Sequence, residues 1–182
     1  MTMRHTISVC IAGAIGSFAL LLLIISVGTP VWLDNGSGST IGLFSTCYGD
    51  NVATTIAPGG PGCYNEDRAP SAGLSVVGIL LLSGSIILTI IGALSEEHKK
   101  QLLGASVVLC YFSSMFVMSA YATWGVYSRD ENLYTFPSTP PASLANHTAM
   151  GSSYNLCVAA HYFLWTALTI IAAAFGYTLN TR

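Results

Sequence analysis

Four long runs of apolar and small residues constrain the fold of this chain of 182 residues. No Asp, Glu, Lys or Arg interrupts any of these runs. A helix needs about 20 apolar residues to cross the hydrocarbon core of a bilayer. We therefore expect four membrane-spanning helices, at about residues 7–28, 72–94, 102–126 and 154–179. The first run is longer than the apolar core of a signal peptide, so we expect it to be retained.

The connections between the runs predict an all-α membrane protein, a four-transmembrane-helix bundle that forms a single domain over residues 1–182. Residues 29–71 and 127–153 are the expected outer loops, and residues 95–101 are the expected inner loop. Because that inner loop is short, the second and third spans should be antiparallel neighbours.

A small extracellular β-sheet is expected from the first outer loop. Thr40–Tyr48 has the composition of a strand, and Pro58–Gly62 is typical of a tight turn or an irregular loop. The sheet should rest on the outer ends of the helices.

The distribution of positive charge predicts the orientation. Four of the six Lys and Arg residues lie in the tails and the inner loop, namely Arg4, Lys99, Lys100 and Arg182. By the positive-inside rule, both termini of this multi-pass protein should be cytoplasmic, and we expect the plasma membrane as its location. Glycosylation triplets begin at Asn35 and Asn146, both in segments expected outside, so both are possible glycosylation sites.

The outer loops are acidic. Asp50, Glu66 and Asp67 lie close in sequence to the two cysteines of the first outer loop. They are either a solvated loop surface or a charge-selective site whose field attracts cations. The chain has no basic patch, which argues against a nucleic-acid partner.

Five cysteines divide into two groups. Cys10, Cys110 and Cys157 lie inside apolar runs, where cysteine usually behaves as a small apolar residue. Cys47 and Cys63 share the first outer loop, in an oxidising compartment, so we expect a disulfide between them. In the chain-entropy description such a bridge stabilises the fold by about 3 kcal/mol.

One loop motif resembles a known family. Trp32 follows the first span, Gly42-Leu43-Phe44 and Cys47 come next, and Cys63 follows. This pattern resembles the claudin superfamily of tetraspan proteins, whose first outer loop carries Trp, then Gly-Leu-Trp-x-x-Cys, then Cys. Phe44 stands where the family has its second Trp, a variant closer to the clarins and the lipoma-HMGIC-fusion-partner-like proteins than to typical claudins. Gly151–Tyr154 is similar to the start of the family's last helix.

The motif also has a physical interpretation of its own. Gly42 permits a close backbone approach, Leu43 and Phe44 supply apolar groups, and Trp32 suits a membrane interface. These residues either hold the sheet to the helices or contact a partner directly. We expect the packing role for Trp32, Leu43 and Phe44, and partner contact at the loop tips.

The sequence predicts neither an enzyme nor a cofactor-binding or metal-binding protein. No motif for a nucleophile, a nucleotide or a metal ion is present. The runs contain no charged residue that could form a transport site. His161 is the one histidine within a run. An intramembrane ionisable residue is a functional candidate by default, yet we expect a structural hydrogen bond to a Ser or Tyr here.

Two functions share these features. In the first, the protein acts in cell-cell contact, in a barrier or in membrane organisation, with membrane lipid and other copies of itself as partners. In the second, it is an auxiliary subunit that packs against an ion channel or receptor and modulates its gating or trafficking. The resemblance implies either role. The C-terminal tail ends Leu179-Asn180-Thr181-Arg182, which does not favour anchoring to a junctional scaffold.

Overall fold

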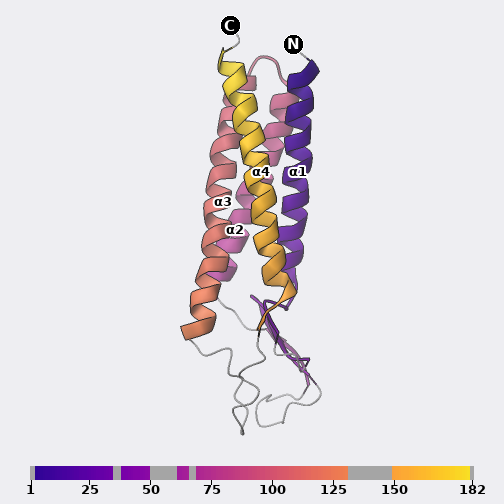
Figure 1. Ribbon diagram of the computed structural model, residues 1–182, viewed down its shortest axis with the longest axis vertical. Coiled ribbons are helices and arrows are strands. Elements are labelled where there is room, and N and C mark those ends of the chain that lie inside the picture. Colours follow the sequence, from indigo (N-terminus) through magenta and orange to yellow (C-terminus); the bar gives the residue numbers. More distant parts are fainter. Residues whose placement is uncertain (1–2, 35–37, 50–60, 66–68, 131–148, 181–182) are drawn as a thin grey trace.

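The computed structural model of the chain describes residues 3–34, 38–49, 61–65, 69–130 and 149–180. Four helices run side by side along the molecule (Figure 1). They are α1 (Met3–Gly28), α2 (Ala69–Leu94), α3 (Lys99–Asp130) and α4 (Ser152–Asn180). All four are long and apolar enough to cross a membrane, so each predicted span is confirmed as a helix of the necessary length. By length and composition, these helices indicate a multi-pass membrane protein.

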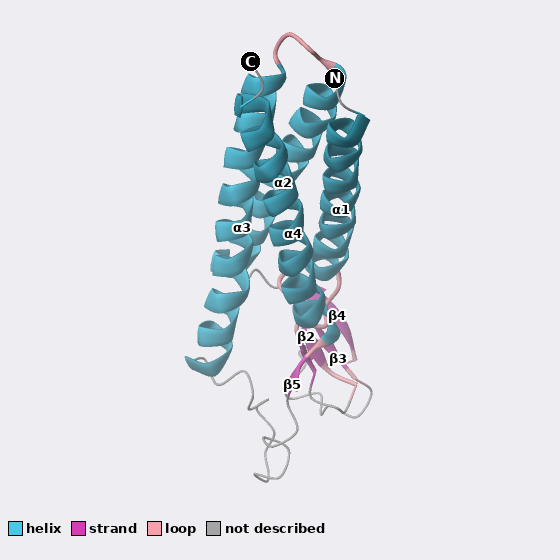
Figure 2. Cartoon of the chain, turned by 45° about the horizontal axis from the view of Figure 1, so that its top comes forward, coloured by secondary structure: helices cyan, strands magenta, loops and turns pink. Residues whose placement is uncertain are grey.

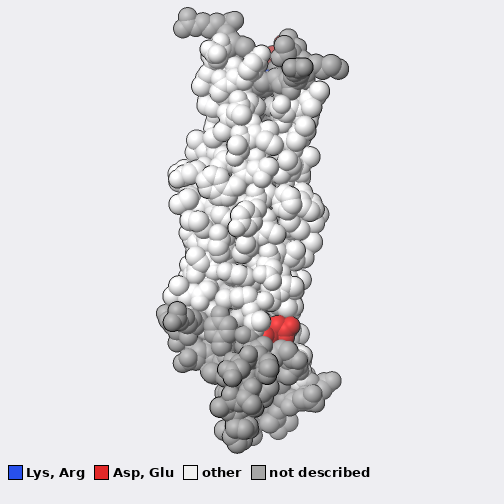
Figure 3. Space-filling view, viewed as in Figure 1, with Lys and Arg blue, Asp and Glu red and all other residues white. Residues whose placement is uncertain are grey.

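Both termini and the α2–α3 connection lie at one end of the bundle, and the strands lie at the other (Figure 1). The closest helix pairs are α2 with α3 and α1 with α4, which confirms that the second and third spans are neighbours. On the face drawn in Figure 3, the described charged atoms are visible only near the two ends. The long middle zone is uncharged, as a lipid-facing surface should be.

The inner connection is shorter than predicted, because α3 begins at Lys99 within the segment expected to be a loop. The backbone N–H of Leu102 donates to the carbonyl of His98 at 3.0 Å, so the first helical turn already includes Lys99 and Lys100. Lysine is a good helix former, and no Gly or Pro interrupts the segment.

A five-stranded antiparallel sheet caps the end of the bundle opposite the termini, which we call the outer end after its predicted orientation (Figure 2). Its strands are β1 (Leu33–Asp34), β2 (Thr40–Ile41), β3 (Ser45–Tyr48), β4 (Gly62–Asn65) and β5 (Ala149–Met150). They lie in the order β4-β3-β2-β1-β5. A small antiparallel sheet is therefore confirmed, but two details of the prediction are wrong.

The first correction concerns the segment Thr40–Tyr48, which was expected to be one strand. It forms a hairpin of β2 and β3, because the N–H of Gly42 donates to the carbonyl of Ser45 at 2.8 Å and the chain reverses there.

The second correction concerns the origin of the sheet. The first loop does not supply all of it, because β5 comes from the segment before α4 and pairs with β1.

Hydroxyl groups join α2 to α3 in the middle of the bundle. The Ser106 hydroxyl lies 2.9 Å from the Ser85 hydroxyl and 2.6 Å from the Thr89 hydroxyl, and all three residues are buried. Nearer the outer end, Ser113 donates to the carbonyl of Gly78 at 2.8 Å. A Cβ added at Gly78 would lie 2.8 Å from Val117 Cγ2, so glycine allows this close approach.

Candidate functional site

Trp32 anchors the place where the sheet meets the helices. It directly precedes β1, its side chain is fully buried, and its ring Nε1–H donates to the carbonyl of Ser26 at 2.8 Å. Its ring packs edge-on against Trp124 of α3 and Tyr154 of α4, with centroids 5.5 and 5.9 Å apart. Trp32 therefore does not lie exposed at a membrane interface, where the sequence suggested it could sit. It connects three helices, α1 through this hydrogen bond and α3 and α4 through the ring contacts.

Gly42 forms the turn that sets the hairpin against the helix end. A Cβ added at this position would lie only 2.6 Å from Pro30 Cα, a separation that real Cβ atoms essentially never show. Because α1 ends at Gly28, the turn is packed just beyond the outer end of that helix. The close backbone approach predicted for Gly42 is therefore present.

Leu43 and Phe44 occupy the same turn but have different environments. The Leu43 side chain is completely buried and belongs to the main apolar core with Trp32 and Trp124. The Phe44 side chain is 40% exposed. Of the three residues expected to pack, Trp32 and Leu43 are buried, whereas Phe44 offers an apolar ring at the surface of the turn.

The predicted disulfide joins Cys47 of β3 to Cys63 of β4. The two residues are directly opposite each other in the antiparallel register, so the bridge reinforces the hairpin-like pairing of these strands. The other three cysteines are free, with Cys10 exposed and both Cys110 and Cys157 buried.

The start of α4 is bound to the exit of α1, which the sequence did not predict. The N–H of Gly151 donates to the carbonyl of Trp32 at 2.9 Å, and the N–H of Ser153 donates to the carbonyl of Val31 at 3.0 Å. A Cβ at Gly151 would collide with the carbonyl oxygen of Val31, so only glycine fits. The one signal in the sequence was the resemblance of Gly151–Tyr154 to the family's last helix.

Three hydroxyl residues complete this contact. Ser26 donates to the carbonyl of Ser153 at 2.7 Å, and the hydroxyls of Thr29 and Ser153 lie 2.6 Å apart. We refer to Ser26, Trp32, Gly42, Leu43 and Gly151 as the outer junction. It fixes the sheet, the end of α1 and the beginning of α4 in one rigid unit.

His161 lies in a polar network between α3 and α4. Its Nε2 accepts a hydrogen bond from the ring N–H of Trp165 at 2.9 Å and lies 3.0 Å from the Ser114 hydroxyl. An indole N–H can only donate, so Nε2 carries no proton and the neutral ring holds its proton on Nδ1. That nitrogen lies 3.1 Å from the Tyr121 hydroxyl and donates to it. The expected hydrogen bonding of His161 to Ser and Tyr is confirmed.

Several predicted sites lie outside the described residues. These are the glycosylation triplets at Asn35 and Asn146 and the acidic residues Asp50, Glu66 and Asp67. Within the described part of the chain, no group of three or more His, Cys, Asp or Glu residues could hold a metal ion.

The chain matches no family model and no curated protein. Its resemblance to the claudin superfamily therefore stays a prediction that depends on the motif residues.

Proposed function

We propose that this chain is a claudin-like, non-enzymatic membrane protein that acts in cell-cell contact, barrier formation or membrane organisation. In this proposal it crosses the plasma membrane four times with both termini in the cytoplasm, and the sheet faces the cell exterior. Cell-cell junctions are the expected place of action. Copies of the same chain are the expected partners.

One observation carries the proposal. The motif residues that resemble the superfamily converge on the outer junction, where Trp32, Gly42 and Leu43 attach the sheet to the helix ends. The sheet is cross-linked by Cys47–Cys63 and paired with a strand from the second outer segment. Loops held by such a rigid support are suited to binding, because little conformational entropy is lost when they meet a partner.

Two tyrosines supply a contact surface on the described part of the sheet. Tyr48 and Tyr64 come from neighbouring strands, and their ring centroids are 5.9 Å apart. Tyr48 lies three residues along β3 from Ser45, so it is about 10 Å farther from the turn that begins at Gly42. Tyrosine is enriched in protein interfaces because its ring is apolar and its hydroxyl can hydrogen-bond. We assign Phe44, in the turn that packs on Pro30 through Gly42, to the headgroup layer of the membrane instead.

The test is a contact assay between cells that express the full chain and carry two different colours. The protein should accumulate where two expressing cells touch, and less so where an expressing cell touches a non-expressing one. Replacing both tyrosines, Tyr48→Ser with Tyr64→Ser, should abolish the accumulation. The matched control is Phe44→Ser, which should retain it.

Each variant must reach the cell surface with the Cys47–Cys63 bridge formed, which non-reducing mass spectrometry verifies. If the wild-type protein at the surface shows no enrichment between expressing cells, the contact function is wrong. Cross-linking in native membranes then tests the auxiliary-subunit role. That role requires cross-linked products that contain a channel or receptor in a fixed ratio to this chain, and not a series of oligomers of this chain alone.

A further inference from the structure

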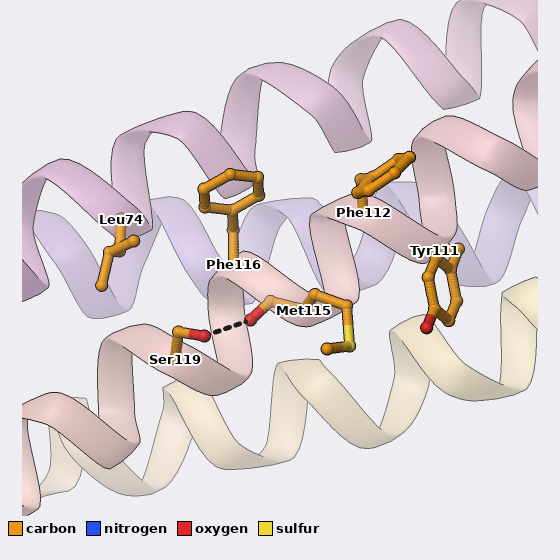
Figure 4. A pocket seen from close by; sticks show the side chains of 6 residues that line it. All are labelled: Leu74, Tyr111, Phe112, Met115, Phe116 and Ser119. Atoms are coloured by element: carbon orange, nitrogen blue, oxygen red, sulfur yellow. Dashed lines mark hydrogen bonds between the residues drawn. The ribbon is translucent and has the colours of Figure 1, made fainter.

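An aromatic groove lies on the exposed side of the helix bundle, along α2 and α3 and away from the sheet. It is lined by Leu74 of α2 and by Tyr111, Phe112, Met115, Phe116 and Ser119 of α3, and its volume is about 320 Å³. Figure 4 shows Phe116 between Leu74 and Phe112, with five of the six side chains on one helix. The side chains of Tyr111, Phe112 and Met115 are 46%, 49% and 38% exposed. We call this surface the α3 groove.

Tyr111 lies near the middle of the predicted membrane thickness. At a rise of about 1.5 Å per residue, about 14 Å of helix separate it from Leu102, the first apolar residue of α3. About 20 Å separate it from Trp124 toward the outer end. The hydrocarbon core is about 30 Å thick, so the Tyr111 hydroxyl cannot reach headgroups or water on either side.

The Tyr111 hydroxyl has no hydrogen-bond partner among the described residues, and the ring contacts Phe112 with centroids 5.8 Å apart. Several serine and threonine hydroxyls on the helix surfaces avoid this situation. Ser17, Ser119, Thr166 and Thr169 each donate to the carbonyl four residues earlier in their own helix, at 2.8 to 3.0 Å. A tyrosine hydroxyl is too far from its own backbone to do so, and in hydrocarbon it needs a partner from another molecule.

We propose that the α3 groove is a lateral interface between two copies of this chain in one membrane, with Tyr111 of each copy hydrogen-bonded to that of the other. Two copies inserted in the same direction are related by a twofold axis along the membrane normal, so identical residues lie at identical depth. A phenolic hydroxyl is both donor and acceptor, which makes a Tyr–Tyr pair self-complementary. The exposed Phe112 and Met115 supply adaptable apolar contacts around it.

This interface is separate from the outer loops, so it can exist whether or not the contact function is correct. Purified full-length protein, labelled with a fluorophore, is reconstituted in liposomes over a range of protein-to-lipid ratios, and photobleaching steps are counted. Wild-type protein should dimerise. Tyr111→Phe, which removes only the hydroxyl, should weaken dimerisation about three- to tenfold, the range expected for one interhelical hydrogen bond.

The matched control is Tyr162→Phe, because Tyr162 is a 70% exposed phenol on α4 outside the groove. This variant should dimerise like the wild type. A wild-type protein that stays monomeric at every ratio would overturn the proposal, and so would equal dimerisation of Tyr111→Phe and wild type.

A second measurement identifies the face without depending on the hydroxyl. In a Cys10→Ser background, Phe112→Cys should form a covalent homodimer under mild oxidation in liposomes. Leu80→Cys, whose parent side chain on α2 is 66% exposed, should not. Cross-linking through Leu80→Cys but not through Phe112→Cys would place the interface elsewhere and refute the assignment.

Discussion

Leu43 and Phe44 are adjacent apolar residues with different environments in the turn that follows Gly42. Leu43 fills the core below the sheet, while Phe44 leaves 40% of its side chain exposed. The turn started by Gly42 points consecutive side chains in different directions. Truncating a fully buried leucine removes apolar contacts and leaves a cavity, whereas truncating a ring that is 40% exposed removes fewer buried contacts and leaves no enclosed cavity.

The first prediction compares these two neighbours. Leu43→Ala should lower the free energy of unfolding by about 2–5 kcal/mol, and Phe44→Ala should change it by less than about 1 kcal/mol. Reversible unfolding in mixed detergent–lipid micelles measures both values. An equal loss in the two variants would mean that Phe44 packs as tightly as Leu43.

The second prediction concerns Gly42. Gly42→Ala forces a methyl group to within 2.6 Å of Pro30 Cα, so the turn or the helix end must shift. Overpacking of this kind costs about 1–3 kcal/mol. We expect a lower midpoint of thermal unfolding and reduced delivery to the cell surface.

Gly125→Ala is the matched control, since a Cβ there meets nothing within 4 Å and Gly125 lies inside α3. Alanine favours helix over glycine, so this variant should be neutral or slightly stabilised. Destabilisation of Gly125→Ala equal to that of Gly42→Ala would argue against a specific clash with Pro30.

At the scale of elements, the sheet depends on more than the backbone hydrogen bonds between the strands of the first loop. Its strands have only two to four residues each, too short to be stable alone. The bridge between β3 and β4 and the pairing of β5 with β1 supply the missing restraint. The sheet is therefore best regarded as part of the helix bundle.

The third prediction removes the bridge. The double variant Cys47→Ala with Cys63→Ala avoids a reactive leftover thiol and should cost about 3 kcal/mol, because the closed loop spans 16 residues. Unfolding in micelles and surface expression measure the loss. Cys10→Ser, which removes an exposed free cysteine, should behave like the wild type. Unchanged stability of the double variant would show that the bridge is dispensable.

At the scale of the whole molecule, the two ends of the helix bundle differ in what they carry. The termini and the α2–α3 connection share one end of the bundle, and the sheet occupies the other (Figure 1). Four crossings of a membrane by these helices would put the two ends in different compartments. By the positive-inside rule, the basic residues of the tails and the inner connection predict that the first end is cytoplasmic.

The fourth prediction tests this orientation in intact cells. In a Cys10→Ser background, Ala149→Cys in β5 should react with a membrane-impermeant maleimide. Glu97→Cys, in the exposed α2–α3 connection, should react only after permeabilisation. The parent without an added cysteine serves as control, because Cys110 and Cys157 are buried. The reverse labelling pattern would invert the proposed topology.

The sequence predicted the features that depend on local composition. Long uncharged runs require helices wherever water is absent, because every backbone polar group must then be paired internally. Two cysteines in one loop, which we expect in an oxidising compartment, predicted their bridge, and the glycine before Leu43 predicted a close backbone approach. The boundaries were less accurate. α2 begins at Ala69 and α3 at Lys99, before the apolar runs, since the small and polar residues beside an apolar run can also be helical.

Only the tertiary structure showed which distant residues meet. β5 has two residues and no alternating pattern, and its pairing with β1 arises because Gly151 and Ser153 dock on the exit of α1. The same holds for the burial of Leu43 against the exposure of Phe44, and for the unpaired hydroxyl of Tyr111 among the described residues. Sequence by itself determined the helices, because their hydrogen bonds are local. The junction depends on contacts between residues far apart in the chain, and the exposure of the α3 groove depends on which helix faces pack against each other. Composition and spacing encode neither.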